Sequence, residues 1–75
     1  MGVAQDDAEA VRFWKLAADQ GFTRAAFNLG WMYENGRGVA RDLAEAIRWY
    51  ERAAAKGDEK AKAAHLRAEA RARAA

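Results

Sequence analysis

The feature that most constrains the fold of this chain is a stretch of sequence that occurs twice. Residues 2–12 read GVAQDDAEAVR and residues 38–48 read GVARDLAEAIR, with eight of eleven letters identical at an offset of 36 residues. The same offset pairs similar residues further along: Phe13/Trp49, Trp14/Tyr50, Ala17/Ala53, Ala18/Ala54, Gly21/Gly57 and Ala25/Ala61. A period of about 20–50 residues is typical of proteins that stack one supersecondary unit on the next, because a single unit cannot bury its apolar face.

Composition indicates that these units are helical. The chain has no proline and is rich in Ala, Glu, Lys and Arg, most of which have high helix propensity. Much of its apolar content is alanine, which buries little area, so its three Trp, two Tyr and three Phe must supply most of the core. A chain of 75 residues is marginal for one domain and needs regular helix packing or a neighbour.

Helix start and stop residues recur at the same period. We expect equivalent helices over residues 6–20 and 42–56, each capped by an aspartate and stopped by a glycine (Asp6 and Gly21, Asp42 and Gly57).

Between them, a second helix should begin at Thr23, a weak cap, with Phe22 and Phe27 at the spacing of a hydrophobic staple, and end before Asn35. A fourth helix should follow Asp58 and run to the C-terminus.

Helical periodicity predicts which side of each helix is buried. The expected stripes are Ala10, Phe13, Trp14, Ala17 and Ala18 on the first helix, Ala25, Leu29, Met32 and Tyr33 on the second, and Ala46, Trp49, Tyr50, Ala53 and Ala54 on the third. Gly30 interrupts the second helix at a cost of about 1 kcal/mol relative to alanine. We therefore expect it to allow the close approach of a neighbouring helix that carries Trp14 or Trp49.

One segment resembles a known family. LGWMYENGRGVARDLAEAIRWYERAAAKG (residues 29–57) is similar to a unit of the Sel-one-like repeat family, relatives of the tetratricopeptide repeats. The Leu-Gly-x-Met-Tyr stretch, the Gly-x-Gly-Val loop, the Trp-Tyr pair and the Ala-Ala before a Gly all match, and the resemblance covers residues 2–57. It implies an α-solenoid of antiparallel helix pairs that acts as a protein-binding scaffold and holds no cofactor.

We predict an all-α helix-turn-helix repeat solenoid, similar to a tetratricopeptide superhelix, with about two repeats and four helices. Residues 1–75 form a single domain, divided into a first unit (2–37) and a second unit (38–75) that ends in a polar capping helix (58–75). In that last helix AKAAHL replaces the AAFNLG of the first unit, so that His65 stands at the position of Leu29 and Leu66 at that of Gly30.

Residues for catalysis or metal binding are scarce. The chain has no cysteine and no serine, and Thr23 is better used as a helix cap than as a nucleophile. His65 is the single histidine, with Glu69 one turn away, and two such ligands do not make a zinc site; we expect a partly exposed helix histidine. The Gly36-Arg37-Gly38 loop is read as a turn with positive φ, not a phosphate loop, because no strand precedes it. We predict that the chain is not an enzyme and binds no cofactor or metal.

Equivalent surface positions suggest a binding face. Glu9, Arg12 and Leu16 on the first helix point away from its apolar stripe, and Glu45, Arg48 and Arg52 are their counterparts on the third. Stacked units would align these six residues into one row, named here the ladder, on the concave face that the resemblance assigns to ligands. The other interpretation is an ordinary charged surface with one stray leucine, and we favour that interpretation.

Two further surfaces have more than one interpretation. Phe27 and Trp31 either stack internally, which we favour, or form an exposed interface between copies. The last helix carries Lys60, Lys62, Arg67, Arg71 and Arg73. Because it lacks aromatic residues, a solvated capping helix is favoured over a nucleic-acid or membrane-binding one, and the net charge of +2 agrees.

The predicted function is a scaffold module that binds a protein or peptide. The alternative is a structural fragment that forms homo-oligomers through its truncated repeat end, because about three repeats are usually needed for an independent core; nucleic-acid binding is weaker still. The first residues lack a signal-peptide pattern and the myristoylation pattern, and no apolar run approaches the ~20 residues of a membrane span, so we expect no membrane partner. The sequence leaves the cellular compartment open.

Overall fold

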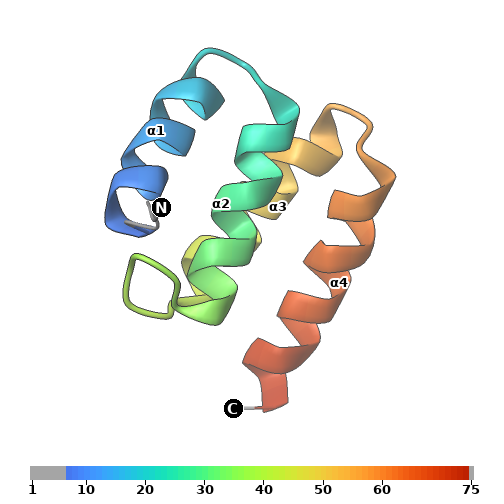
Figure 1. Ribbon diagram of the computed structural model, residues 1–75. Helices are drawn as coiled ribbons and strands as arrows, with labels where there is room; N and C mark the ends of the chain where they lie inside the picture. Colours follow the sequence, from blue (N-terminus) through green and yellow to red (C-terminus); the bar gives the residue numbers. More distant parts are fainter. Residues whose placement is uncertain (1–6, 75) are drawn as a thin grey trace.

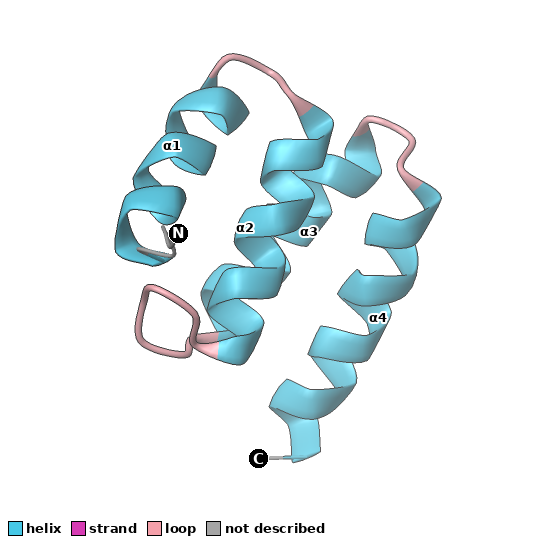
Figure 2. Cartoon of the chain, in the orientation of Figure 1, coloured by secondary structure: helices cyan, strands magenta, loops and turns pink. Residues whose placement is uncertain are grey.

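The computed structural model describes residues 7–74, which form four helices. They are α1 (Asp7–Asp19), α2 (Thr23–Asn35), α3 (Leu43–Ala55) and α4 (Glu59–Ala74). Consecutive helices run in opposite directions, α2 packs against both α1 and α3, and α4 packs against α3 (Figure 1). Within the described residues all regular structure is helical (Figure 2), which confirms the all-α prediction.

Most of the predicted helix ends are confirmed. The Asp42 side chain accepts a hydrogen bond from the Glu45 backbone N–H at 3.1 Å and so caps α3. Asp58 does the same for α4, accepting from the N–H groups of Lys60 (2.9 Å) and Ala61 (3.2 Å). The other aspartate that was predicted as a cap, Asp6, lies outside the described residues.

The predicted cap of α2 is wrong. Phe22 occupies the N-cap position and Thr23 is already helical, so no side chain caps this end. The ring of Phe22 is 62% exposed, so the expected staple with Phe27 does not bury it. At the other end Gly36 adopts the left-handed conformation (φ 67°), and its N–H bonds the Met32 carbonyl, which closes the helix as a glycine stop should.

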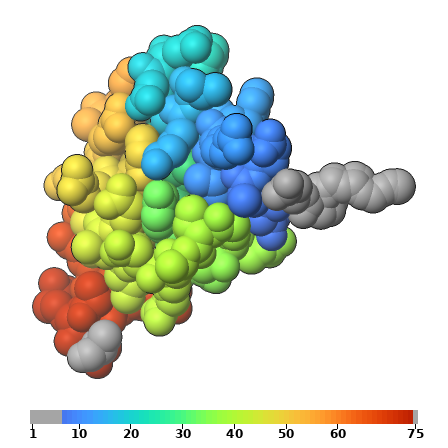
Figure 3. All heavy atoms as spheres, turned by 90° about the vertical axis from the view of Figure 1, so that its left-hand side faces the viewer, coloured from blue at the N-terminus to red at the C-terminus, as the bar shows by residue number. Residues whose placement is uncertain are grey.

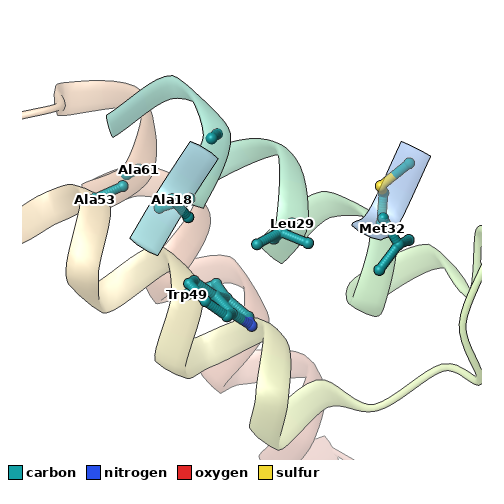
Figure 4. Packing of buried hydrophobic residues seen from close by; sticks show 9 residues of the cluster. Ala18, Leu29, Met32, Trp49, Ala53 and Ala61 are labelled. Carbon is teal, nitrogen blue, oxygen red and sulfur yellow. The ribbon is translucent and has the colours of Figure 1, made fainter. Parts of the chain in front are cut away.

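The core lies between α2 and α3, with α1 and α4 on its two sides. Leu29 and Met32 of α2 gather with Trp49 of α3 in one interior (Figure 4), as predicted from their helical spacing. The predicted stripe of α3 is likewise buried at four positions and half-buried at Ala54.

The predicted stripe of α1 is wrong in part. Phe13 is 61% exposed, although Trp49, its equivalent 36 residues later, is only 7% exposed. Val11 is buried instead, beside Ala18 and with Trp14 half-buried. The reason is positional: α3 packs against both α2 and α4, whereas the main packing partner of α1 in the described structure is α2, so its buried arc turns toward α2.

The expected close approach of a neighbouring helix to Gly30 is confirmed, but the side chain that contacts Gly30 is Tyr50 and not a tryptophan. A β-carbon at this position would lie 2.5 Å from the Cδ1 and Cε1 atoms of Tyr50. The approaching helix is α3, which carries Trp49 as predicted, but the ring that fills the space is that of the following residue, Tyr50. Tyr50 is fully buried and its ring also lies 5.6 Å from that of Phe27.

Candidate functional site

The six ladder residues lie on the outer sides of α1 and α3. Glu9, Arg12 and Leu16 are exposed on α1, Arg48 and Arg52 are exposed on α3, and Glu45 is half-buried near the α3 N-terminus. Glu9 and Arg12 form an ion pair within α1 at 3.6 Å. Both side chains are well exposed, so this pair contributes little to stability and leaves the guanidinium able to meet a ligand.

Leu16 is the apolar point of the ladder. Its side chain is 65% exposed, and it lies in a shallow hollow of the α1 surface together with Arg12, Lys15 and Asp19. Figure 3 shows the α1 side of the molecule, where the atoms of this helix lie at the surface. An exposed leucine between two cations and one carboxylate can accept an apolar side chain while the rim fixes its polar neighbours.

A second hollow joins the two units. It lies between the C-terminal ends of α1 and α3 and the start of α2, holds about 210 Å³, and is lined by Asp19, Phe22, Arg52 and Lys56 among others. Asp19 lines both hollows, so the hollow of Leu16 adjoins the hollow of Arg52. The alignment of Glu9 with Glu45, of Arg12 with Arg48 and of Leu16 with Arg52 stays a prediction.

Arg52 and Lys56 are held in place at this junction. The Arg52 guanidinium lies 4.6 Å from the centroid of the Trp49 ring, a cation–π contact at the edge of the core. Lys56 donates from Nζ to the Gly21 carbonyl at 3.3 Å and thereby links the two tight turns that the repeat places 36 residues apart. Both cations therefore face the hollow from a restricted set of positions.

Phe27 and Trp31, which were predicted as a pair, lie in different environments. Phe27 is half-buried and packs on both parts of the core, so it stacks internally. Trp31 is 41% exposed, and the Arg37 guanidinium covers its ring at 5.7 Å from the centroid. Internal stacking therefore describes Phe27, and Trp31 lies at the surface; an interface between copies at these residues stays a prediction.

A buried carboxylate is the feature that the sequence reasoning missed. Glu34, near the end of α2, is 1% exposed. Its Oε1 accepts from the Tyr50 hydroxyl at 2.7 Å and from Arg67 Nη2 at 2.8 Å, and its Oε2 accepts from Arg67 Nε at 3.0 Å and Arg71 Nη1 at 2.8 Å. Two arginines of α4 and one tyrosine of α3 thus converge on one residue of α2. Charge-assisted hydrogen bonds of this kind can stabilise a carboxylate that is buried in a core.

These contacts set the protonation states of the network. The hydrogen bonds from Arg67, helped by those from Tyr50 and Arg71, lower the pKa of Glu34 from about 4.5 to about 2 against the opposing effect of burial. Burial, and then the hydrogen bond to the Glu34 carboxylate, raises the pKa of Tyr50 well above its usual range. Glu34 is therefore an anion, and Tyr50 a neutral donor, at every physiological pH.

The sequence does carry a signal for this network. Glu34 lies four residues after Gly30 and so on the same side of α2, the side against which Tyr50 packs. Arg67 and Arg71 are also four residues apart and share one side of α4. These spacings place Glu34 on the side of Gly30 and the two arginines in step with one another, but they do not show that the three helices bring these residues together.

Three of the five basic residues of α4, and its histidine, lie beside carboxylates. Arg67 and Arg71 bond Glu34, and Lys62 pairs with Glu59 at 3.2 Å. His65 is partly exposed, as predicted, between Glu51 (3.9 Å) and Glu69 (3.7 Å). Among residues 7–74 no group of three His, Cys, Asp or Glu side chains is placed to hold a metal ion. In the same part of the chain, no helix combines the length and apolar character that crossing a bilayer requires.

Stacked antiparallel helix pairs and a sequence period of 36 residues define an all-α repeat protein of the solenoid class. The model of the Sel1 repeat matches residues 1–22 and 23–58, more than half of the chain. The chain therefore belongs to the Sel1 repeat family, as the resemblance of its motifs indicated. The match places unit borders after Phe22 and Asp58, whereas the predicted border follows Arg37; both divisions keep the same period.

A solved structure agrees with this assignment. The chain is similar to the crystal structure of a Sel1 repeat protein from Oxalobacter formigenes, with 39% sequence identity and a TM-score of 0.82. The match covers 85% of this chain and 26% of that one, so the chain spans about a quarter of the length of this relative. No curated protein matches the chain. Sel1 repeats are generally protein-interaction modules of a non-catalytic scaffold type.

Proposed function

We propose that this chain binds a protein or peptide partner through the ladder on α1 and α3, without catalysis. The observation that carries the proposal is the exposed Leu16, which lies between the cations of Arg12 and Lys15 in one hollow and adjoins, through Asp19, the hollow of Arg52. An apolar point with a mixed-charge rim is the arrangement that protein interfaces use. A segment with one apolar side chain next to acidic residues is the complementary ligand.

A selection experiment tests this proposal. Peptides selected from a random display library against the whole chain would be assayed with the double variant Arg12→Glu, Arg48→Glu. We expect the affinity to fall at least about tenfold, the ratio that corresponds to about 1.4 kcal/mol. The matched control is Arg24→Glu, Lys60→Glu, which changes the charge equally at exposed positions outside the ladder. Selected peptides that respond to the control and ignore the ladder variant would contradict the proposal.

A second candidate function is self-association through the outer side of α1. It is favoured by the exposed ring of Phe13, which stacks edge-on against Trp14 at 5.1 Å and whose equivalent, Trp49, is buried by a preceding helix pair. Another copy would cover this ring in the same way. Sedimentation over a hundredfold concentration range separates the candidates: a dimer that is lost in Phe13→Glu supports self-association, and a monomer at all concentrations contradicts it.

A further inference from the structure

Three arginines from two segments meet at Glu34. Arg67 and Arg71 of α4 bond its carboxylate, and Arg41, in the loop between α2 and α3, donates from Nε to its backbone carbonyl at 3.3 Å. The C-terminal half of α4 and this loop lie at the same end of the molecule (Figure 1), and their atoms form a continuous lower edge in the side view (Figure 3). These three residues are named here the arginine cluster.

The cluster holds more positive charge than its carboxylate neutralises. Arg67 and Arg71 bond the buried carboxylate of Glu34, and Arg41 bonds the backbone carbonyl of the same residue, so the three guanidinium groups and the one carboxylate carry a net charge of +2. The Arg67 and Arg71 side chains are 52% and 43% exposed, so one side of each faces solvent. In the described part of the chain the hydrogen bonds of Arg71 engage Nη1 alone. Its Nε–H and Nη2–H groups remain available to an external acceptor.

The internal contacts also fix the geometry of the cluster. An arginine on an ordinary surface loses side-chain conformational entropy when it binds an anion. Here Arg67 is held by two hydrogen bonds to the Glu34 carboxylate and Arg71 by one, so much of that entropy is already lost on folding. The free edges of the guanidinium groups are therefore pre-organised for the planar, two-point contact that a carboxylate offers.

We propose that the arginine cluster of Arg41, Arg67 and Arg71 binds the carboxylate side chains of an acidic protein segment. The site is separate from the ladder and shares no residue with it, so it is a second contact surface on the same chain. A single-stranded nucleic acid is a poorer ligand for this site. Such ligands bind along basic grooves with aromatic side chains for base stacking, whereas the three arginines all bond one residue, Glu34, and the Glu34 carboxylate lies between Arg67 and Arg71.

Fluorescein-labelled hexaglutamate is a direct probe, with binding measured by anisotropy at about 20 mM salt, where screening is weak. The variants are Arg41→Gln and Arg71→Gln, each of which leaves Arg67 paired with Glu34 and Tyr50. The matched control is Arg24→Gln, which removes the same charge at an exposed position at the start of α2, the opposite end of that helix. Circular dichroism verifies that each variant is folded, and hexauridylate RNA with the same label serves as the competing ligand class.

We expect each cluster variant to weaken hexaglutamate binding at least about fivefold, and Arg24→Gln to change it less than about twofold. Equal weakening by all three variants would reduce the effect to net charge and overturn the proposal. Absence of hexaglutamate binding would overturn it as well, as would tighter binding of hexauridylate with the same dependence on Arg41 and Arg71. Because the ladder is intact in all these variants, their results do not test the proposed function, which is tested separately by the ladder variant.

Discussion

Acid titration of stability isolates the contribution of Glu34. The pKa of this carboxyl is about 2 in the folded chain and about 4.5 without its partners. Because the folded-state pKa is the lower one, the stabilisation is fully present above about pH 4.5 and disappears as the pH falls through about 2. The difference of about 2.5 pKa units corresponds to about 3 kcal/mol of stability at neutral pH, since one unit is worth about 1.4 kcal/mol.

This is a large fraction of the total for so small a domain, whose free energy of unfolding is expected to be on the order of 4–11 kcal/mol. Because the Glu34 side chain is 1% exposed, solvent screens its ion pairs little and most of this difference contributes to stability.

The assay is urea unfolding of the chain and of Glu34→Gln at a series of pH values from about 6 to about 2, followed by circular dichroism. Glutamine keeps an oxygen for the Tyr50 hydroxyl and the shape of the side chain, but it cannot ionise. We expect the stability difference between the two proteins to be about 3 kcal/mol at pH 6 and to fall below about 1 kcal/mol at pH 2. A difference that is constant with pH would refute the reasoning, because it would mean that the charge of Glu34 contributes nothing to folding.

Three further predictions concern packing and capping. Gly30→Ala should lower the stability, because overlap with the Tyr50 ring costs about 1–3 kcal/mol while helix propensity returns only about 1 kcal/mol; a raised melting temperature would contradict the close approach. Asp42→Ala should lose about 1 kcal/mol in urea unfolding through the loss of the α3 cap, and an unchanged midpoint would show that the cap is dispensable. Trp49→Ala should cost about 3–5 kcal/mol and Phe13→Ala less than about 0.5 kcal/mol by the same assay, whereas similar losses would indicate that both rings are buried.

Local rules predict much of the fold. The ends of α3 and α4 follow from Asp42 and Asp58, whose carboxylates cap their own helices, and the buried sides of α2 and α3 follow from helical spacing. These features depend on residues close in sequence, so the chain itself contains the information. The helix α2 also begins at Thr23, as predicted, but Phe22 occupies its N-cap position and no side chain caps it.

Burial on α1 could not be predicted in the same way. The repeat gives α1 the apolar pattern of a helix with neighbours on two sides, and Phe13 is part of that pattern. Whether the ring is buried depends on which helices are present around it, which periodicity does not state. The buried carboxylate of Glu34 was missed for a related reason, because its partners come from α3 and α4 and only the packing of three helices brings them together.

The two units have the same helix pattern but differ at the positions where the next helix would pack. On the side of α2 that packs against α3, the first unit has Ala26, Leu29 and Gly30. The equivalent positions of α4 are Lys62, His65 and Leu66. A ring that approached Leu66 as Tyr50 approaches Gly30 would overlap its side chain. The equivalent of Glu34 is Ala70, so the hydroxyl of such a ring would also find no acceptor. We therefore predict that a further helix would not pack on α4 as α3 packs on α2, which agrees with the expected capping role of this helix. Arg67 and Arg71 of α4 instead bond Glu34.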